Sequence, residues 1–323
     1  MENHLLEYIE IKDFKCFKNF KAEGFKRVNL IGGKNNVGKT AFMEACYINT
    51  HSHDIRYLTF ALENINFARN NLEYVAKGYS RQQRIVNLES NNINVISNKN
   101  SVQFNVIDEL GIKNYKFIIN ELTETININN FSYSSLWDKS IIHIDNFGLT
   151  NSNLKDIFES VQKKDKEEIL YRFINEFDNN IDKFKIMRGE NPECKVIDRD
   201  EYQDINEFGD GLKHYISIIC SLYACENGYL FIDEIDNGIH YTQLDRLWEI
   251  ILTISKEQNV QVFATTHSKE CIESYARVSK KFEDEDISFI ELGKNKENKL
   301  DSIVMNSERL QRHLSQGNEV RGW

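Results

Sequence analysis

The chain has 323 residues, 41% of them hydrophobic, so it is long enough to bury a sizeable core, and its net charge is −10. This acidic balance argues against a general nucleic-acid-binding protein, because contacts to phosphate need clustered Lys and Arg. The six cysteines show no CxxC pair or zinc-site spacing, and no apolar run approaches the length of a membrane span. We therefore expect a cytoplasmic protein without a membrane partner.

The N-terminal segment has the pattern of strands followed by a glycine-rich loop and a helix. Strands are predicted over residues 8–14, 17–25 and 28–31, and a helix is predicted to begin near Gly38 and to continue through Ala41. Six basic residues crowd this segment: Lys12, Lys15, Lys18, Lys21, Lys26 and Arg27. We interpret them as the solvated face of the early strands, with a local DNA-facing patch as the less favoured alternative.

The middle of the chain changes pattern twice. Residues 63–84 are expected to be helical, and residues 85–131 to form antiparallel strands, because short alternating apolar runs are separated there by Asn. Helical spacing returns over 154–186. Pro192 is expected in a polar loop.

The last third alternates helices and strands, which favours a parallel α/β sheet. The predicted elements are a helix over 212–223, a strand over 229–232, a helix over about 242–256, strands over 260–264 and 287–292, and a short helix that Ser307 caps and that ends near Gly317. We expect a single domain over 1–323, made of an N-terminal part at 1–50, a β-rich then helical insertion at 51–205, and a C-terminal half at 206–323.

One octapeptide between a predicted strand and a predicted helix fits the phosphate-binding pattern G-x-x-x-x-G-K-[ST]. It reads Gly33-Lys34-Asn35-Asn36-Val37-Gly38-Lys39-Thr40, and Ala41 follows it. The glycines let backbone amides turn toward phosphate, and the start of the helix adds the positive end of its dipole. Lys39 is the predicted cation for the β- and γ-phosphates of ATP, and the Thr40 hydroxyl is a predicted Mg²⁺ ligand.

Two further strand ends carry polar groups. The buried strand 229–232 runs into Asp233 and Glu234, and the next predicted strand runs into Thr265-Thr266-His267-Ser268. Parallel strands end at the same edge of a sheet, so these groups should meet the P-loop. Asp233 is the predicted Mg²⁺ ligand, Glu234 the predicted base for the attacking water, and His267 the predicted sensor of the γ-phosphate.

These motifs together resemble those of the ABC-type ATPases, and more closely those of the small AAA-labelled bacterial ATPases of the RecF, SMC and OLD lineage. The resemblance identifies Gly209-Asp210-Gly211 as a signature loop, with glycine where the family has serine, and Asp236-Asn237-Gly238 as a D-loop. It implies an ABC-type head of α/β fold that dimerises around ATP and acts in DNA repair or phage defence. It also implies a Q-loop glutamine, for which Gln82, Gln83 and Gln103 are candidates.

The resemblance leaves the output of the ATPase open. We expect a homodimer or higher oligomer that controls a separately encoded effector, above all a nuclease of the TOPRIM type, and DNA is a further candidate partner. Alternatives are a RecF-type repair protein without a nuclease and, less favoured, a transporter motor. The acidic run 283–286 is interpreted as a solvated turn, and Leu310 and Leu314 with the terminal 321–323 as a candidate docking surface.

Overall fold

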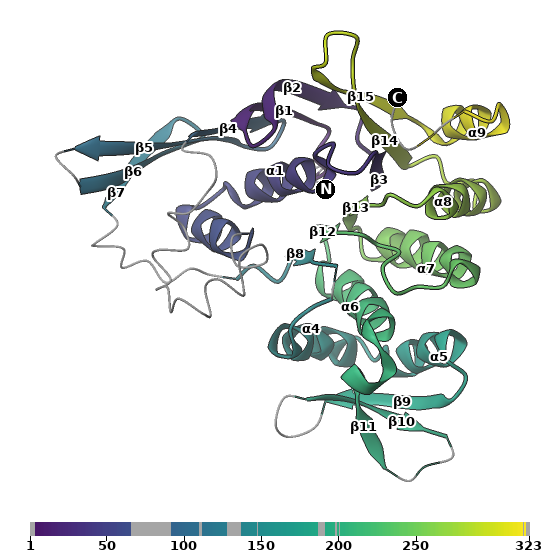
Figure 1. Cartoon of the computed structure of the whole chain (residues 1–323). Coiled ribbons are helices and arrows are strands. Elements are labelled where there is room, and N and C mark those ends of the chain that lie inside the picture. The colour runs from purple at the N-terminus through teal and green to yellow at the C-terminus, as the bar shows by residue number, and fades with distance from the viewer. Residues whose placement is uncertain are drawn as a thin grey trace.

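The computed structural model in Figure 1 describes residues 4–65, 92–109, 112–127, 137–146, 148–186, 191–197, 199, 201–318 and 320. Its centre is a six-stranded sheet of order β15-β14-β3-β13-β12-β8. The five strands from β14 to β8 are parallel, and only β15 pairs in the antiparallel sense. Their bounds are β3 Val28–Gly33, β8 Ile141–Ile144, β12 Tyr229–Ile232, β13 Gln261–Thr265, β14 Ile287–Lys294 and β15 Leu300–Met305.

The central strands are mainly apolar because both faces of the sheet are covered. Alternate residues of one strand join two different cores: Leu230 and Ile232 pack into one core, and Phe231 packs into the other. Figure 1 shows α6, α7 and α8 on one side of the sheet and α1 on the other. The bounds are α1 Lys39–His51, α6 Asp210–Ala224, α7 Leu244–Glu257 and α8 Lys269–Lys281, with 3₁₀ turns at Ile205–Phe208 and Tyr241–Gln243.

A second sheet, antiparallel and of order β2-β1-β4-β5-β6-β7, extends from the α1 side of the molecule (Figure 1). Its strands are β1 Tyr8–Phe14, β2 Phe17–Glu23, β4 Asn92–Ser97, β5 Ser101–Glu109, β6 Ile112–Ile119 and β7 Leu122–Asn127. The prediction of antiparallel strands in this stretch is confirmed. Residues 55–65 are helical, and the rest of the helix expected over 63–84 lies outside the described residues.

The helical prediction for 154–186 is correct only in part. Helices α4 Asn151–Lys163 and α5 Glu167–Phe177 form, but β9 Ile181–Ile186 is a strand, and it pairs with β10 Pro192–Val196, which pairs with β11 Tyr202–Asp204. The turn at Asp178–Asn180 ends the helical run. Pro192 is the first residue of a strand and not a loop residue, a position at which its missing N–H is tolerated.

The C-terminal segment packs against the head. Helix α9 Ser307–Ser315 is capped by Asn306, whose side chain accepts a hydrogen bond from Arg309 N, and not by Ser307 as predicted. Leu310 is fully buried and Leu314 packs against the same core, so the proposed apolar docking stripe is instead part of the fold. Residues 321–323 lie outside the described residues. Among the helices that the structure describes, none is long and apolar enough to cross a membrane.

Candidate functional site

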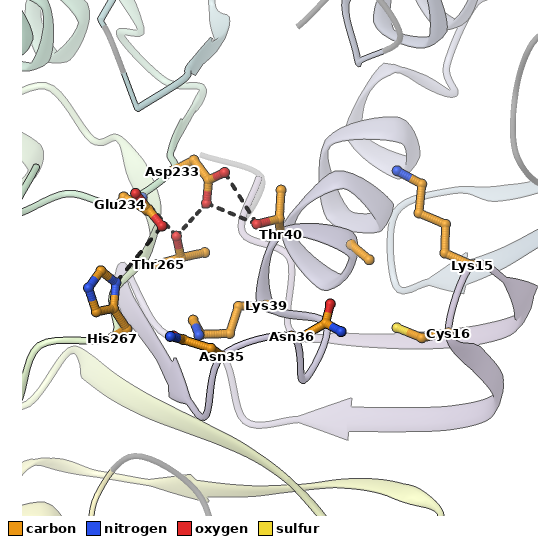
Figure 2. Close-up of a pocket in the computed structure, with 12 residues that line it drawn as sticks. Lys15, Cys16, Asn35, Asn36, Lys39, Thr40, Asp233, Glu234, Thr265 and His267 are labelled. Carbon is orange, nitrogen blue, oxygen red and sulfur yellow. Dashed lines mark hydrogen bonds and ion pairs between the residues drawn. The ribbon is translucent and has the colours of Figure 1, made fainter. Parts of the chain in front are cut away.

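A cavity of about 640 Å³ opens where the carboxyl ends of β3, β12 and β13 meet the start of α1. Its lining residues come from four segments: Lys15 and Cys16 between β1 and β2; Asn35, Asn36, Gly38, Lys39, Thr40 and Ala41; Asp233 and Glu234; and Thr265 and His267. Figure 2 shows Glu234 and His267 at one end of this cavity, Lys15 and Cys16 at the other, and the P-loop between them.

The loop between β3 and α1 depends on glycine at its last position. Gly38 caps α1 in the left-handed conformation, with φ of 101°, and a Cβ there would lie 2.6 Å from Cys16 Sγ. Helix α1 then begins at Lys39, so the N-terminal backbone amides of the helix face the cavity end of β3. Gly33, Lys34 and Val37 belong to the same loop but do not line the cavity, and the Val37 side chain is buried.

Lys39 folds back over its own loop. Its Nζ donates to Gly33 O at 2.9 Å and to Lys34 O at 3.1 Å. Burial lowers the pKa of Lys39, and the nearby carboxylates of Asp233 and Glu234 oppose that shift. The ammonium group therefore lies between the loop carbonyls and the acidic strand end.

Asp233 and Thr40 meet across the cavity although 193 residues separate them in sequence. Thr40 Oγ1 lies 3.2 Å from each carboxylate oxygen of Asp233, and Thr265 Oγ1 donates to Asp233 Oδ1 at 2.5 Å. The same Thr265 hydroxyl accepts a hydrogen bond from Glu234 N at 2.9 Å. The predicted metal ligands are thus adjacent, and Thr265 joins them although sequence analysis had assigned it no role.

Glu234 and His267 form the exposed end of the site. His267 Nδ1 lies 3.9 Å from Glu234 Oε1, and the two side chains are 52% and 43% exposed. Both can therefore reach a ligand in the cavity. The expectation that the ends of β12 and β13 bring these two residues together agrees with this geometry.

The residues of the predicted signature loop lie elsewhere. Gly209, Asp210 and Gly211 begin α6 and do not line the cavity. Gly211 instead contacts the predicted D-loop of the same chain, because a Cβ on Gly211 would lie only 2.0 Å from Gly238 O. Asp236 of that D-loop accepts a hydrogen bond from Thr266 Oγ1 at 2.6 Å.

One of the three candidates for a Q-loop glutamine, Gln103, lies among the described residues, and it is not at the site. Gln103 lies within β5 and does not line the cavity, and residues 82 and 83 lie outside the described residues. Strand β8 runs parallel to β12 with Ile144 opposite Ile232, so Asp145 follows at the edge where Asp233 lies. The sequence pattern did not predict β8 as a strand of the central sheet.

The basic N-terminal residues divide into two groups. Lys12, Lys18, Lys21 and Lys26 are exposed, as predicted for a solvated face. Lys15 instead pairs with buried Glu44, and the buried guanidinium of Arg27 pairs with Asp284. Asp284 is thus a structural partner within the acidic run 283–286, and not simply a solvated residue. Among the described residues, no group of three His, Cys, Asp or Glu could hold a metal ion.

A buried parallel strand, a glycine-rich loop that opens a helix, and a carboxylate strand end beside the loop's threonine define a P-loop nucleotide-binding protein. A family model described as AAA ATPase domain matches residues 113–272. An ATP/GTP phosphatase of Helicobacter pylori is 25% identical over 83% of this chain and 87% of its own length. An uncharacterized protein of Methanocaldococcus jannaschii, MJECL11, is 37% identical over 20% of this chain and 57% of its own length.

A solved SMC head, bound in that crystal structure to the C-winged helix domain of ScpA, has the same fold. It aligns with a TM-score of 0.53 at 14% identity, over 94% of this chain and 98% of its own. The chain is thus similar to an AAA ATPase domain and to an ATP/GTP phosphatase, which supports ATPase activity, and it shares the fold of an SMC head.

Proposed function

We propose that this ATPase binds ATP with Mg²⁺ in the cavity described above and hydrolyses it with Glu234 as the base. The observation that carries the proposal is the contact between Thr40 and Asp233, with Glu234 next in the chain. It places a hydroxyl, two carboxylates and the P-loop lysine around one cavity.

The donor set fits Mg²⁺. Thr40 Oγ1 and the Asp233 carboxylate are hard oxygen donors 3.2 Å apart, and Mg²⁺ takes few protein ligands because it keeps waters and substrate phosphates. Thr40 and Asp233 would hold the ion, Asp233 through water. When bound, the ion neutralises negative charge on the phosphate oxygens.

The P-loop supplies the phosphate contacts. The backbone of residues 33–41 turns around the cavity end of β3, and the amides at the start of α1 point toward an anion there. Lys39 can exchange its two loop carbonyls for phosphate oxygens, because a lysine side chain is a mobile point charge. Asn35 and Asn36 add amide groups along the same wall.

Glu234 acts on water and not on the nucleotide. Its half-exposed carboxylate faces the cavity beside His267, where it can orient a water and take its proton as that water attacks the γ-phosphorus. His267 is close enough to contact the γ-phosphate and Glu234 together. Lys15 and Cys16 line the opposite end of the cavity (Figure 2), where the base of the nucleotide would lie. The name of the Helicobacter pylori relative supports a test of GTP beside ATP.

The roles of the carboxylate and the lysine separate in an experiment. Glu234→Gln should retain nucleotide binding and lose turnover by about 10² to 10⁴-fold, the usual contribution of a general base. Lys39→Ala should weaken nucleotide binding itself. Steady-state hydrolysis and equilibrium binding of a fluorescent ATP analogue would be measured on both. Turnover near wild type in Glu234→Gln would remove Glu234 from the proposed role.

The position of the signature loop supports a composite site in a dimer. Gly209, Asp210 and Gly211 begin a helix away from the cavity of their own chain, so contact with nucleotide requires a second copy. We assign the whole chain, 1–323, to a single ATPase head, two copies of which would form this dimer.

Mixing two defective variants tests this arrangement. Asp210 is exposed, so Asp210→Trp should block the signature loop without disturbing the core. In a mixed dimer with Lys39→Ala, one of the two sites is intact. Activity above that of either variant alone is expected, and its absence in verified mixed dimers would contradict a shared site.

The output of the ATPase is assigned to a partner. Its kinship with the RecF and SMC-like class supports a role in DNA maintenance or anti-phage defence, with a separately encoded nuclease, above all of the TOPRIM type, as effector. No group of three His, Cys, Asp or Glu in the described part of the chain could hold a metal ion, and Asp284 pairs with Arg27. The purified chain should hydrolyse ATP without cutting DNA, and pull-down from the native host should recover the effector. Metal-dependent DNA cleavage by the pure chain would overturn this assignment.

A further inference from the structure

The hydroxyl of Thr265 makes two hydrogen bonds to consecutive residues of the neighbouring strand end. Thr265 is the last residue of β13 and is 1% exposed, yet it lines the cavity. Its Oγ1 donates to Asp233 Oδ1 at 2.5 Å and accepts from Glu234 N at 2.9 Å. The Thr265 hydroxyl thus donates its single proton to Asp233 and accepts a hydrogen bond, through a lone pair, from the next residue, Glu234 (Figure 2).

The second of these bonds holds an unusual backbone conformation. Glu234 has φ of 48°, in the left-handed region that residues other than glycine seldom adopt, and such conformations persist where surrounding contacts enforce them. Thr265 supplies contacts on both sides of this turn. Its hydroxyl accepts from Glu234 N, and its carbonyl oxygen accepts from Ile235 N at 3.0 Å. The direction in which the Glu234 side chain enters the cavity therefore depends on Thr265.

The first bond fixes the other carboxylate. Asp233 accepts from two threonines, at 3.2 Å from Thr40 and at 2.5 Å from Thr265. Hydrogen bonds to a charged carboxylate are stronger than neutral ones, and the shorter contact restrains the side chain more. Thr265 is also almost fully buried, whereas Thr40 is the second residue of the P-loop helix and faces the nucleotide side of the cavity.

We infer that Thr265 is a positioning residue that sets the orientation of both Asp233 and Glu234 through its one hydroxyl group. The inference rests on the proposed roles of these two carboxylates in metal binding and in water activation. It predicts a paired defect, in Mg²⁺ dependence and in turnover, from the loss of a single oxygen atom.

Thr265→Val removes the hydroxyl and keeps the shape of the side chain. We expect kcat to fall about 10- to 100-fold, the effect of losing a hydrogen bond to a charged group. The Mg²⁺ concentration that half-saturates binding of a fluorescent ATP analogue should rise several-fold, while binding measured in EDTA stays unchanged. Thr265→Ser keeps the hydroxyl and should restore both quantities to within about threefold of wild type.

Thr50→Val is the matched control. Thr50 is 4% exposed, and its hydroxyl makes a hydrogen bond to Tyr47 O away from the cavity. Its loss should lower the thermal midpoint by an amount similar to that in Thr265→Val and leave kcat and the Mg²⁺ requirement unchanged. If Thr265→Val does not fold, Thr265→Ala carries the same comparison without a second methyl group.

Two results would overturn the inference: wild-type kcat and Mg²⁺ dependence in the folded variant that lacks the hydroxyl, or a Thr265→Ser variant as defective as that one. Glu234→Gln is measured alongside. If Glu234→Gln is inactive while Thr265→Val is normal, only the inference fails. If Glu234→Gln turns over normally, the assignment of Glu234 fails instead.

Discussion

Removal of Asp284 should destabilise the protein far more than removal of Asp286, two residues away in the same acidic turn. The Arg27 side chain is 8% exposed, and its guanidinium group donates to Asp284 Oδ2, to Ser255 Oγ and to Leu252 O. The Asp284 side chain is 12% exposed. Asp286 also approaches Arg27, at 3.6 Å, but its side chain is 47% exposed.

The expected magnitudes follow from burial. Asp284→Ala leaves a buried guanidinium group without its close carboxylate, a change that costs about 3 to 5 kcal/mol. Asp286→Ala removes a solvent-screened partner and should cost less than about 1 kcal/mol. For a chain of this size the first loss corresponds to a fall in the thermal midpoint of roughly 4 to 7 °C.

Differential scanning fluorimetry and urea denaturation of the two variants make the comparison. The aspartates alternate in a D-x-D spacing typical of some metal-dependent nucleases. If the two aspartates were catalytic, replacing either one would abolish DNA cleavage and would change the thermal midpoint little. Equal stability of Asp284→Ala and Asp286→Ala, or a loss below about 1 kcal/mol in the first, would refute the structural role of the Arg27–Asp284 pair.

Two further predictions concern the signature helix and acid stability. Gly211→Ala should cost about 1 to 3 kcal/mol and reduce ATPase activity, because the new Cβ would lie 2.0 Å from Gly238 O; unchanged thermal midpoint and activity would contradict this contact. Burial lowers the pKa of His51 and of His214 to about 4, from 6.5. Both are therefore neutral in the folded state and take up protons first in the unfolded chain, so stability should fall as pH drops from 6.5 toward 4, by about 1.4 kcal/mol per pH unit for each histidine. Thermal midpoints between pH 7.5 and 5 test the slope, which should be shallower in His51→Gln.

Four of the six strands of the central sheet, and the P-loop, could be predicted because their sequence signals are local. Strands β3 and β12 are short apolar runs followed at once by glycines or by carboxylates, a pattern typical of buried parallel strands that end at a binding site. Strand β9 could not be distinguished from helix, since Ile181 and Phe184 are three residues apart and suit either structure. The turn at Asp178–Asn180 ends helix α5, so the residues after it form a strand.

The residues that sequence analysis missed act through partners far away in the chain. Thr265 stood in a predicted motif, but His267 was chosen there as the residue that can sense the γ-phosphate by hydrogen bonding. Only the register of β12 with β13, in which Ile232 lies opposite Ala264, brings Thr265 beside Asp233. Lys15 lines the cavity and pairs with Glu44 of α1. This ion pair could not be predicted, because Lys15 is one of several lysines in a segment interpreted as a solvated face. Neither the Thr265–Asp233 contact nor the Lys15–Glu44 ion pair can be predicted from a local sequence pattern.

The strand that carries the P-loop receives both of its neighbours late in synthesis. Within the sheet, β3 lies between β13 and β14, and Val28 is opposite Val262 on one side and Ile287 on the other. At ordinary translation rates these partners emerge roughly 10 to 50 s after β3 itself. During that interval the six residues of β3, which are all buried in the folded protein, have neither neighbouring strand to pair with. Chaperones can bind such an exposed apolar segment. A nascent chain stalled before β14 should therefore fail to retain nucleotide, although its phosphate-binding loop is already complete.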